Sequence, residues 1–281
     1  MLKLFETYHY LTVKQVCDLL GATERRDEGG KLTRKAVQSR LKKMKDAQYL
    51  KRTPVAHDPT VTRLNPITEW SYRLSELGRR VVSEGKYLGE KSPVSASHEQ
   101  DITAFHLALA QFPGKIFWEQ TNLRRTVNPD AMFGLSKDGK MGYYFFLEME
   151  RSKQAGYEDE PGHSNLTAKL EKYEAYRGTE QCKIDWQFFS DFRVIVIVKD
   201  NPRKPGARAN NLLQKLAGRA QYGECGDFRS GWGQTITHPP LPYRYIWVAT
   251  DRAFLEDPMG QIFRTPKDYL VTSYSLPDLY L

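Results

Sequence analysis

Apolar positions in the first third of the chain recur at helical spacing and predict two short amphipathic helices. Thr12 can cap the first helix, which Gly21 can end, and Thr33 can cap the second after a polar turn at residues 24–31. The apolar stripes are Val13, Val16, Leu19 and Leu20 in the first helix and Val37, Leu41 and Met44 in the second. We expect the stripe of the second helix to face a core.

The second helix also carries a polar, mostly basic face. This face consists of Lys35, Gln38, Lys42 and Lys45, with Arg34 and Ser39 beside them near the start of the helix. Two predicted strands follow at residues 49–52 and 70–74, and the loop between them contains Arg63. This order resembles winged helix-turn-helix domains of bacterial regulators and replication proteins, in which the second helix lies in the DNA major groove. The alternative is a basic helix that forms only a solvated surface.

The net charge is confined to the same region. The whole chain has 42 Lys and Arg against 34 Asp and Glu, a net charge of +8. Residues 1–88 alone hold 18 basic and 10 acidic side chains, which is also +8, so the remaining residues are neutral overall. A surplus limited to one domain predicts a polyanionic partner, because neutralised phosphates release their counterions.

The remainder of the chain predicts a second domain of mixed α/β class (α+β). Residues 89–97 look like a linker, so we expect a winged-helix domain at residues 1–88 and an α/β domain at residues 98–281. Strands are predicted at residues 116–119, 141–149, 192–199 and 243–249, and helices at 101–110, from 166 onward and at 210–217. A mixed sheet with helices on its faces fits this pattern best.

Three carboxylates in this second domain suggest a metal site. Glu148 and Glu150 end a predicted strand and lie on the same face, since side chains alternate along a strand. Asp130 precedes a neighbouring strand-like segment. Three hard oxygen ligands are suited to Mg²⁺ or Mn²⁺, and such a metal can activate a water beside a scissile phosphate.

Four segments carry a resemblance to known families. They are SHEQDITAFHLAL (97–109), NPDAMF (128–133), FFLEMERS (145–152) and LTAKLEKYEAY (166–176). After a winged helix, they resemble the replication-relaxation family of plasmids and other mobile elements. The spacing of Asp130 and Glu148 is similar to that of PD-(D/E)XK nucleases, whose restriction-endonuclease-like core is helix, three strands, helix. The resemblance implies catalytic roles for Asp130, Glu148 and an acid on the preceding helix, Glu99 or Asp101.

One position departs from the nuclease motif. The residue two after Glu148 is normally Lys, which positions the attacking water, but here it is Glu150. A lysine supplied by the following helix, Lys169 or Lys172, would restore the site. Otherwise the domain is an inactive nuclease fold.

Two functional hypotheses therefore stay open. In the first, the protein docks on double-stranded DNA and its second domain nicks or cleaves a phosphodiester with Mg²⁺ or Mn²⁺. In the second, it is a regulator or replication-initiation protein without a catalytic metal, and the nuclease-like domain forms a homodimer or recruits replication or mobilisation proteins. We expect a cytoplasmic protein without a membrane partner, because neither a signal peptide nor a spanning segment is evident.

Overall fold

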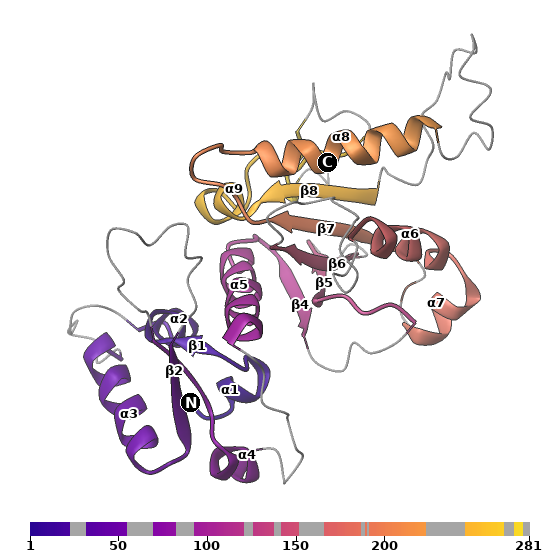
Figure 1. Cartoon of the computed structure of the whole chain (residues 1–281). Coiled ribbons are helices and arrows are strands. Elements are labelled where there is room, and N and C mark those ends of the chain that lie inside the picture. Colours follow the sequence, from indigo (N-terminus) through magenta and orange to yellow (C-terminus); the bar gives the residue numbers. More distant parts are fainter. Residues whose placement is uncertain are drawn as a thin grey trace. The chain divides into compact units, whose positions relative to one another are not determined.

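The computed structural model describes two compact units of a mixed α+β chain (Figure 1). The described residues are 1–22, 32–54, 70–82, 93–120, 126–137, 142–151, 166–186, 189, 191–222, 245–266 and 273–277. The first unit is Met1–Leu107 and the second is Ala108–Leu281. Helix α5 (Pro93–Leu109) begins inside the predicted linker and runs past the division between the units. The mixed α/β class predicted from the sequence is confirmed.

The first unit contains short helices around a three-stranded antiparallel sheet. Before α5 its elements are α1 (Leu4–Thr7), β1 (Leu11–Thr12), α2 (Val13–Leu19), α3 (Arg34–Asp46), β2 (Leu50–Pro54), β3 (Trp70–Leu74) and α4 (Glu76–Val82). The strand order is β1-β3-β2. In this sheet Leu50 pairs with Leu74 and Arg52 pairs with Tyr72. The chain order is therefore helix, strand, helix, helix, strand, strand, helix.

Threonine caps fix where α2 and α3 begin. The Thr33 hydroxyl accepts a hydrogen bond from the Ala36 amide at 3.2 Å. Thr12 and Gln15 form a reciprocal capping box at the start of α2. Each cap satisfies backbone donors that the first helical turn leaves without a partner. Both predicted caps are confirmed.

The buried side of α3 is the predicted one. Val37 and Leu41 are fully buried, and Met44 packs against the same core. The opposite positions of the helix are exposed to solvent, which leaves its basic residues accessible.

The second unit is a five-stranded mixed sheet. Its strands are β4 (Lys115–Glu119), β5 (Ala131–Ser136), β6 (Tyr143–Glu150), β7 (Arg193–Val198) and β8 (Ile246–Thr250), in that spatial order. Neighbouring strands are antiparallel from β4 to β6 and parallel from β6 to β8. The helices are α6 (Leu166–Tyr176), α7 (Glu180–Asp185), α8 (Ala207–Tyr222) and α9 (Asp251–Glu256).

Helices α6 and α8 bury their apolar sides against one face of this sheet. Leu170 and Tyr173 of α6 share a core with Leu212 of α8 and with Phe146 and Val196 of the strands. The strands β7 and β8 are almost wholly buried, as expected for parallel strands. Glu148 is a buried acidic residue on the neighbouring strand β6. Within the described ranges, no helix is both long and apolar enough to cross a bilayer.

Candidate nucleic-acid interface and carboxylate site

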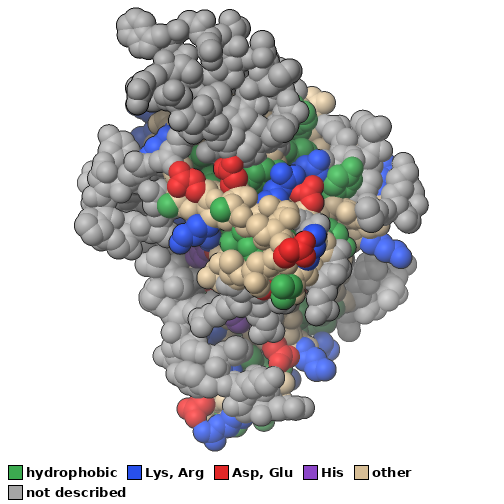
Figure 2. Space-filling view, turned by 90° about the vertical axis from the view of Figure 1, so that its right-hand side faces the viewer, with side chains coloured by type: hydrophobic (Ala, Val, Ile, Leu, Met, Phe, Trp, Pro, Cys, Tyr) green, Lys and Arg blue, Asp and Glu red, His purple; other side chains and the backbone are tan. Residues whose placement is uncertain are grey.

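A groove of about 490 Å³ lies between α3, the start of α2 and the β2–β3 hairpin of the first unit. We call it the basic groove. Its lining residues are Val13, Lys14, Arg34, Gln38, Lys42, Lys45, Arg52, Trp70 and Tyr72. Five of these are cations, and no described residue that lines the groove is acidic. Surface charge elsewhere is different, since Asp and Glu side chains lie among Lys and Arg side chains on the face shown in Figure 2.

The groove contains four of the seven residues predicted to contact DNA. Arg34, Gln38, Lys42 and Lys45 form one stripe of α3, because their spacing of four and three residues keeps them on one side of a helix. Lys35 and Ser39 are exposed on the adjoining, outward side of α3 but do not line the groove. Arg63 lies outside the described residues.

The hairpin supplies residues that the sequence prediction missed. Arg52 of β2 places its guanidinium carbon 3.9 Å from the centre of the Trp70 ring. Trp70 is 40% exposed, although it is a large aromatic residue. Strand alternation was the available signal, because positions 50, 52, 70, 72 and 74 share one face of the hairpin.

The second unit brings three of the predicted catalytic residues together. Lys169 Nζ lies 2.5 Å from Glu148 Oε2, so the helix α6 supplies a cation to the end of β6. Asp130 stands just before β5, next to β6, and its Oδ2 accepts a hydrogen bond from the Met149 amide at 2.8 Å. The Tyr173 hydroxyl donates to the other oxygen of Glu148. We call Asp130, Glu148, Lys169 and Tyr173 the carboxylate site.

Burial dominates the electrostatics of this site. Glu148 is only 4% exposed, and burial together with the nearby Asp130 charge raises the pKa of its carboxyl to about 8. The Lys169 and Tyr173 contacts lower this pKa, but they do not cancel the effect of burial. Burial and the Glu148 charge raise the pKa of Tyr173 well above its ordinary value. The tyrosine therefore stays protonated, as its packing role in the core suggests.

The other predicted catalytic residues are placed differently. Lys172, one turn from Lys169, is exposed. Glu150 ends β6 in a half-buried position. Glu99 and Asp101 belong to the first unit, where His9 Nδ1 lies 3.5 Å from Glu99 Oε2. Their assignment to the carboxylate site stays a prediction.

Asp130 and Glu148 are the two carboxylates of this site that could hold a magnesium ion. Mg²⁺ usually keeps several waters and binds one or two carboxylates, a set that Asp130 and Glu148 can provide. Across the described part of the chain, no group of three or more His, Cys, Asp or Glu side chains is arranged to hold a metal. A metal ion held by Asp130, Glu148 and Glu150 therefore stays a prediction.

A family comparison covers both candidate sites. The model of the replication-relaxation family matches residues 2–190, which is 189 of the 281 residues. The chain belongs to the replication-relaxation family. Its description names replication and relaxation, which suggests a role with plasmid or other mobile DNA. No curated protein and no solved structure matches the chain.

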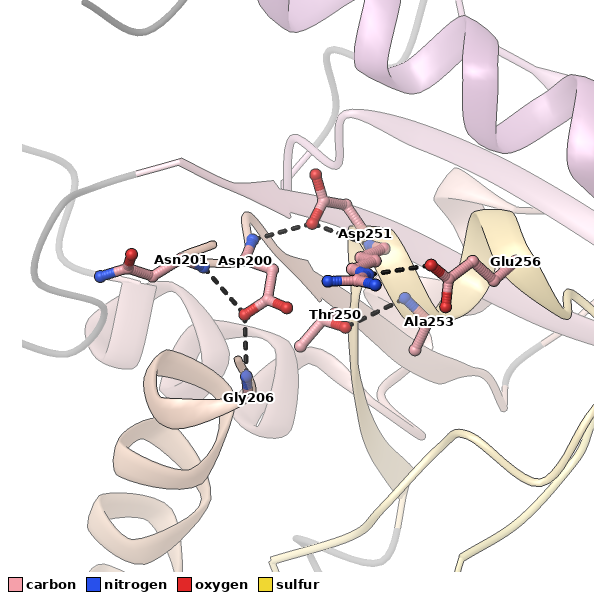
Figure 3. Close-up of polar contacts among 8 residues, drawn as sticks. Asp200, Asn201, Gly206, Thr250, Asp251, Ala253 and Glu256 are labelled. Carbon is pink, nitrogen blue, oxygen red and sulfur yellow. Dashed lines mark hydrogen bonds and ion pairs between the residues drawn. The ribbon is translucent and has the colours of Figure 1, made fainter. Parts of the chain in front are cut away.

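The replication-relaxation match ends before β7, and the chain beyond it has a second pair of acidic residues. Asp200 and Asp251 follow the parallel strands β7 and β8 at their carboxyl ends (Figure 3). An Asp200 oxygen accepts from the amides of Asn201 and Gly206, both at 2.8 Å. Asp251 accepts from the Asp200 amide at 2.8 Å and lies 3.0 Å from Lys199 Nζ. These bonds hold the two connections after the strands, so a structural role accounts for both aspartates.

Proposed function

We propose that this member of the replication-relaxation family binds double-stranded DNA through its first unit and acts in replication or mobilisation of a plasmid or other mobile element. The observation that carries the proposal is the basic groove. Its cations come from three separate elements, α2, α3 and the hairpin, and they converge on one surface. If α3 were only a solvated basic helix, there would be no reason for a cation of the hairpin to lie at the same groove.

The order of elements supports a winged-helix assignment for this unit. A strand precedes α2 and α3, and a two-stranded antiparallel hairpin follows them. In winged helices the second helix of the pair enters the major groove. Here that helix is α3, and Arg34, Gln38 and Lys42 lie exposed along it. The arginine and lysine can pair with phosphates, while the glutamine can hydrogen-bond a base edge.

DNA binding is tested by removing charge from one side of α3 at a time. The pair Arg34→Ala and Lys42→Ala removes two cations from the groove. The control pair, Arg40→Ala and Lys43→Ala, removes two exposed cations from the same helix that do not line it. Binding is measured by fluorescence anisotropy at several salt concentrations.

Each phosphate contact contributes about 0.9 to the slope of log affinity against log salt. The groove pair is therefore expected to reduce the slope by about 2, and the control pair to change it little. Equal losses in both pairs would contradict the groove as the docking surface.

We further propose that the second unit is a PD-(D/E)XK nuclease-like domain that nicks or cleaves DNA. The chain order from α5, of which only the last two residues belong to this unit, through β4, β5 and β6 to α6 agrees with the helix, three strands, helix core of that superfamily. The supporting contact is the one between Lys169 and Glu148. The nuclease motif has a lysine where this chain has Glu150, and Lys169 of α6 supplies a lysine at the site instead. A bound Mg²⁺ or Mn²⁺ would activate water and neutralise phosphate charge. Asp130 and Glu148 would hold the ion, and Lys169 would hold Glu148 in position.

A second candidate, a DNA-binding protein without cleavage, is favoured by a different observation. Both oxygens of Glu148 already have partners, Lys169 and Tyr173, and the side chain is buried. Such a network can stabilise a scaffold without any metal. In that case the second unit serves dimerisation or recruitment of replication or mobilisation proteins.

The two candidates are separated with supercoiled plasmid carrying the native flanking DNA. The protein is incubated with Mg²⁺, with Mn²⁺ and with EDTA, beside the variants Glu148→Ala and Lys169→Met. Lys172→Met is the matched control, since it changes the same residue type at an exposed position one turn away. Nicking that needs metal and is lost in Glu148→Ala and Lys169→Met, but kept in Lys172→Met, supports the nuclease. A gel shift without cleavage under every metal supports the binding protein.

A further inference from the structure

Two aromatic residues of the β2–β3 hairpin, Trp70 and Tyr72, line the basic groove. They lie on the same face of the hairpin as two buried leucines. Leu50 and Leu74 face each other across β2 and β3 and are buried. Two residues further along the same face, Arg52 pairs with Tyr72, and Trp70 follows diagonally. Both aromatic residues line the basic groove. The strand register therefore fixes their position, since one end of the hairpin face is anchored in the core.

The stacking contact with Arg52 covers the Trp70 ring from one side. The guanidinium carbon lies 3.9 Å from the ring centre, and the tryptophan is still 40% exposed. A cation on one face of an indole leaves the opposite face available for a second flat group. If Trp70 only stabilised the hairpin, it would not need to lie among the cations of the groove.

The groove combines the two features that recognise an unpaired nucleotide. Nucleic-acid bases stack on aromatic rings whatever their sequence, and nearby cations hold the backbone phosphates. Trp70 and Tyr72 supply the rings, and Lys42 and Lys45 lie on the α3 side of the same groove. A volume of about 490 Å³ is within the size range of small-ligand sites.

We propose that the basic groove accepts an unpaired nucleotide of bound DNA, with its base stacked on Trp70 and its phosphates against the cations of α3. The protein then prefers duplex DNA that adjoins an unpaired segment, such as a fork, over continuous duplex. This inference rests on the proposed DNA binding of the first unit. It adds which DNA structure the first unit prefers.

The test compares a fully paired duplex with a forked DNA of the same paired length. Each DNA carries a terminal fluorophore for anisotropy, and a second fork has 2-aminopurine at the first unpaired position. Wild type is compared with Trp70→Leu, with Trp70→Phe, which keeps a ring, and with Lys51→Ala. Lys51 is an exposed cation of β2 outside the groove, so its variant controls for charge and for general damage to the hairpin.

Loss of one stacked base by substitution weakens binding by about tenfold. Wild type is therefore expected to bind the fork about tenfold more tightly than the duplex and to quench 2-aminopurine. Trp70→Leu should lose both the preference and the quenching, and it should melt at the temperature of wild type. Trp70→Phe and Lys51→Ala should keep the preference.

Other outcomes separate this inference from the proposed function. Salt-dependent binding of wild type with equal affinity for fork and duplex overturns the inference but leaves DNA docking intact. Failure to bind either DNA overturns both. An equal loss of affinity for fork and duplex in Trp70→Leu also overturns it, because Trp70 would then support the groove generally. Displacement of the fork by a micromolar free deoxynucleoside monophosphate would make the groove a mononucleotide site instead.

Discussion

The basic groove and the carboxylate site use charge in opposite ways. The groove gathers cations on an exposed surface, where salt screens them and a polyanion can replace their counterions. The carboxylate site buries Glu148 between a lysine and a tyrosine, where protonation and not salt controls its charge. The contrast teaches that the first unit should respond to ionic strength through binding, and the second to pH through stability.

The largest expected effect is a loss of stability as the pH rises from about 4.5 to about 8, and it originates at Glu148. Its folded pKa of about 8 lies above the ordinary value of 4.5, so the folded state keeps a proton that the unfolded state has lost. The contribution of Glu148 to the free energy of unfolding is therefore fully present below pH 4.5 and is lost as the pH rises to about 8. At about 1.4 kcal/mol per pH unit, the loss is at most ~5 kcal/mol. Urea unfolding in EDTA, from pH 5 to pH 8.5, measures it.

Glu148→Gln should flatten this pH dependence, because the amide keeps a similar shape and does not titrate. Glu150→Gln is the control, since it makes the same change two residues further along β6 at a half-buried position. If the wild-type loss persisted in Glu148→Gln, the carboxylate site would not be the source, and the comparison with the groove would fail.

A smaller effect of opposite sign is expected from the first unit. Burial lowers the pKa of His106 from 6.5 to about 4, and its Nδ1 lies 2.7 Å from the Tyr8 hydroxyl oxygen. The unfolded state gains a proton first as the pH falls, so stability is full above about pH 6.5 and is lost toward pH 4. The loss is at most ~3 kcal/mol. An NMR titration of the His106 ring locates the pKa directly.

His106→Asn sharpens this assignment, because its side-chain oxygen can accept the Tyr8 hydroxyl without titrating in this range. Near pH 7 the variant and wild type should have similar free energies of unfolding. At pH 4.5 the variant should be the more stable of the two. A His106 ring that titrates near its ordinary pKa would contradict the prediction.

The sequence predicted which side of a helix is buried better than it predicted which distant residues are in contact. The periodicity of Val37 and Leu41 determined which side of α3 is buried, and hence which residues are exposed. The strand that contains Glu148 and the cap at Thr33 were equally accessible from local pattern. Contacts between distant segments were not, because spacing alone cannot say which lysine of α6 meets Glu148. Of the two candidate lysines, Lys169 contacts Glu148, and only tertiary packing distinguishes it from Lys172.

The groove shows the same limit. Trp70 was assigned to a strand, but its position beside α3 depends on the pairing of β3 with β2 and on how the hairpin packs. The short helices α7 and α9 were also missed, since six residues carry too little periodicity to stand out. Asp200, after β7, and Asp251, at the start of α9, belong to no recognisable motif in the sequence, and their backbone contacts appear only in the fold.

The smallest effect compares one substitution in both units. Thr33 caps α3 and Thr250 caps α9, each through a hydroxyl that accepts a backbone amide. Replacing either threonine by alanine should lower the free energy of unfolding by about 1 kcal/mol. Only Thr33→Ala should also weaken DNA binding, because fraying of the first turn of α3 displaces Arg34 from the groove. Thr33→Ser, which keeps the cap, should restore both. Equal effects of Thr33→Ala and Thr250→Ala on DNA affinity would mean that binding follows overall stability and not the geometry of α3.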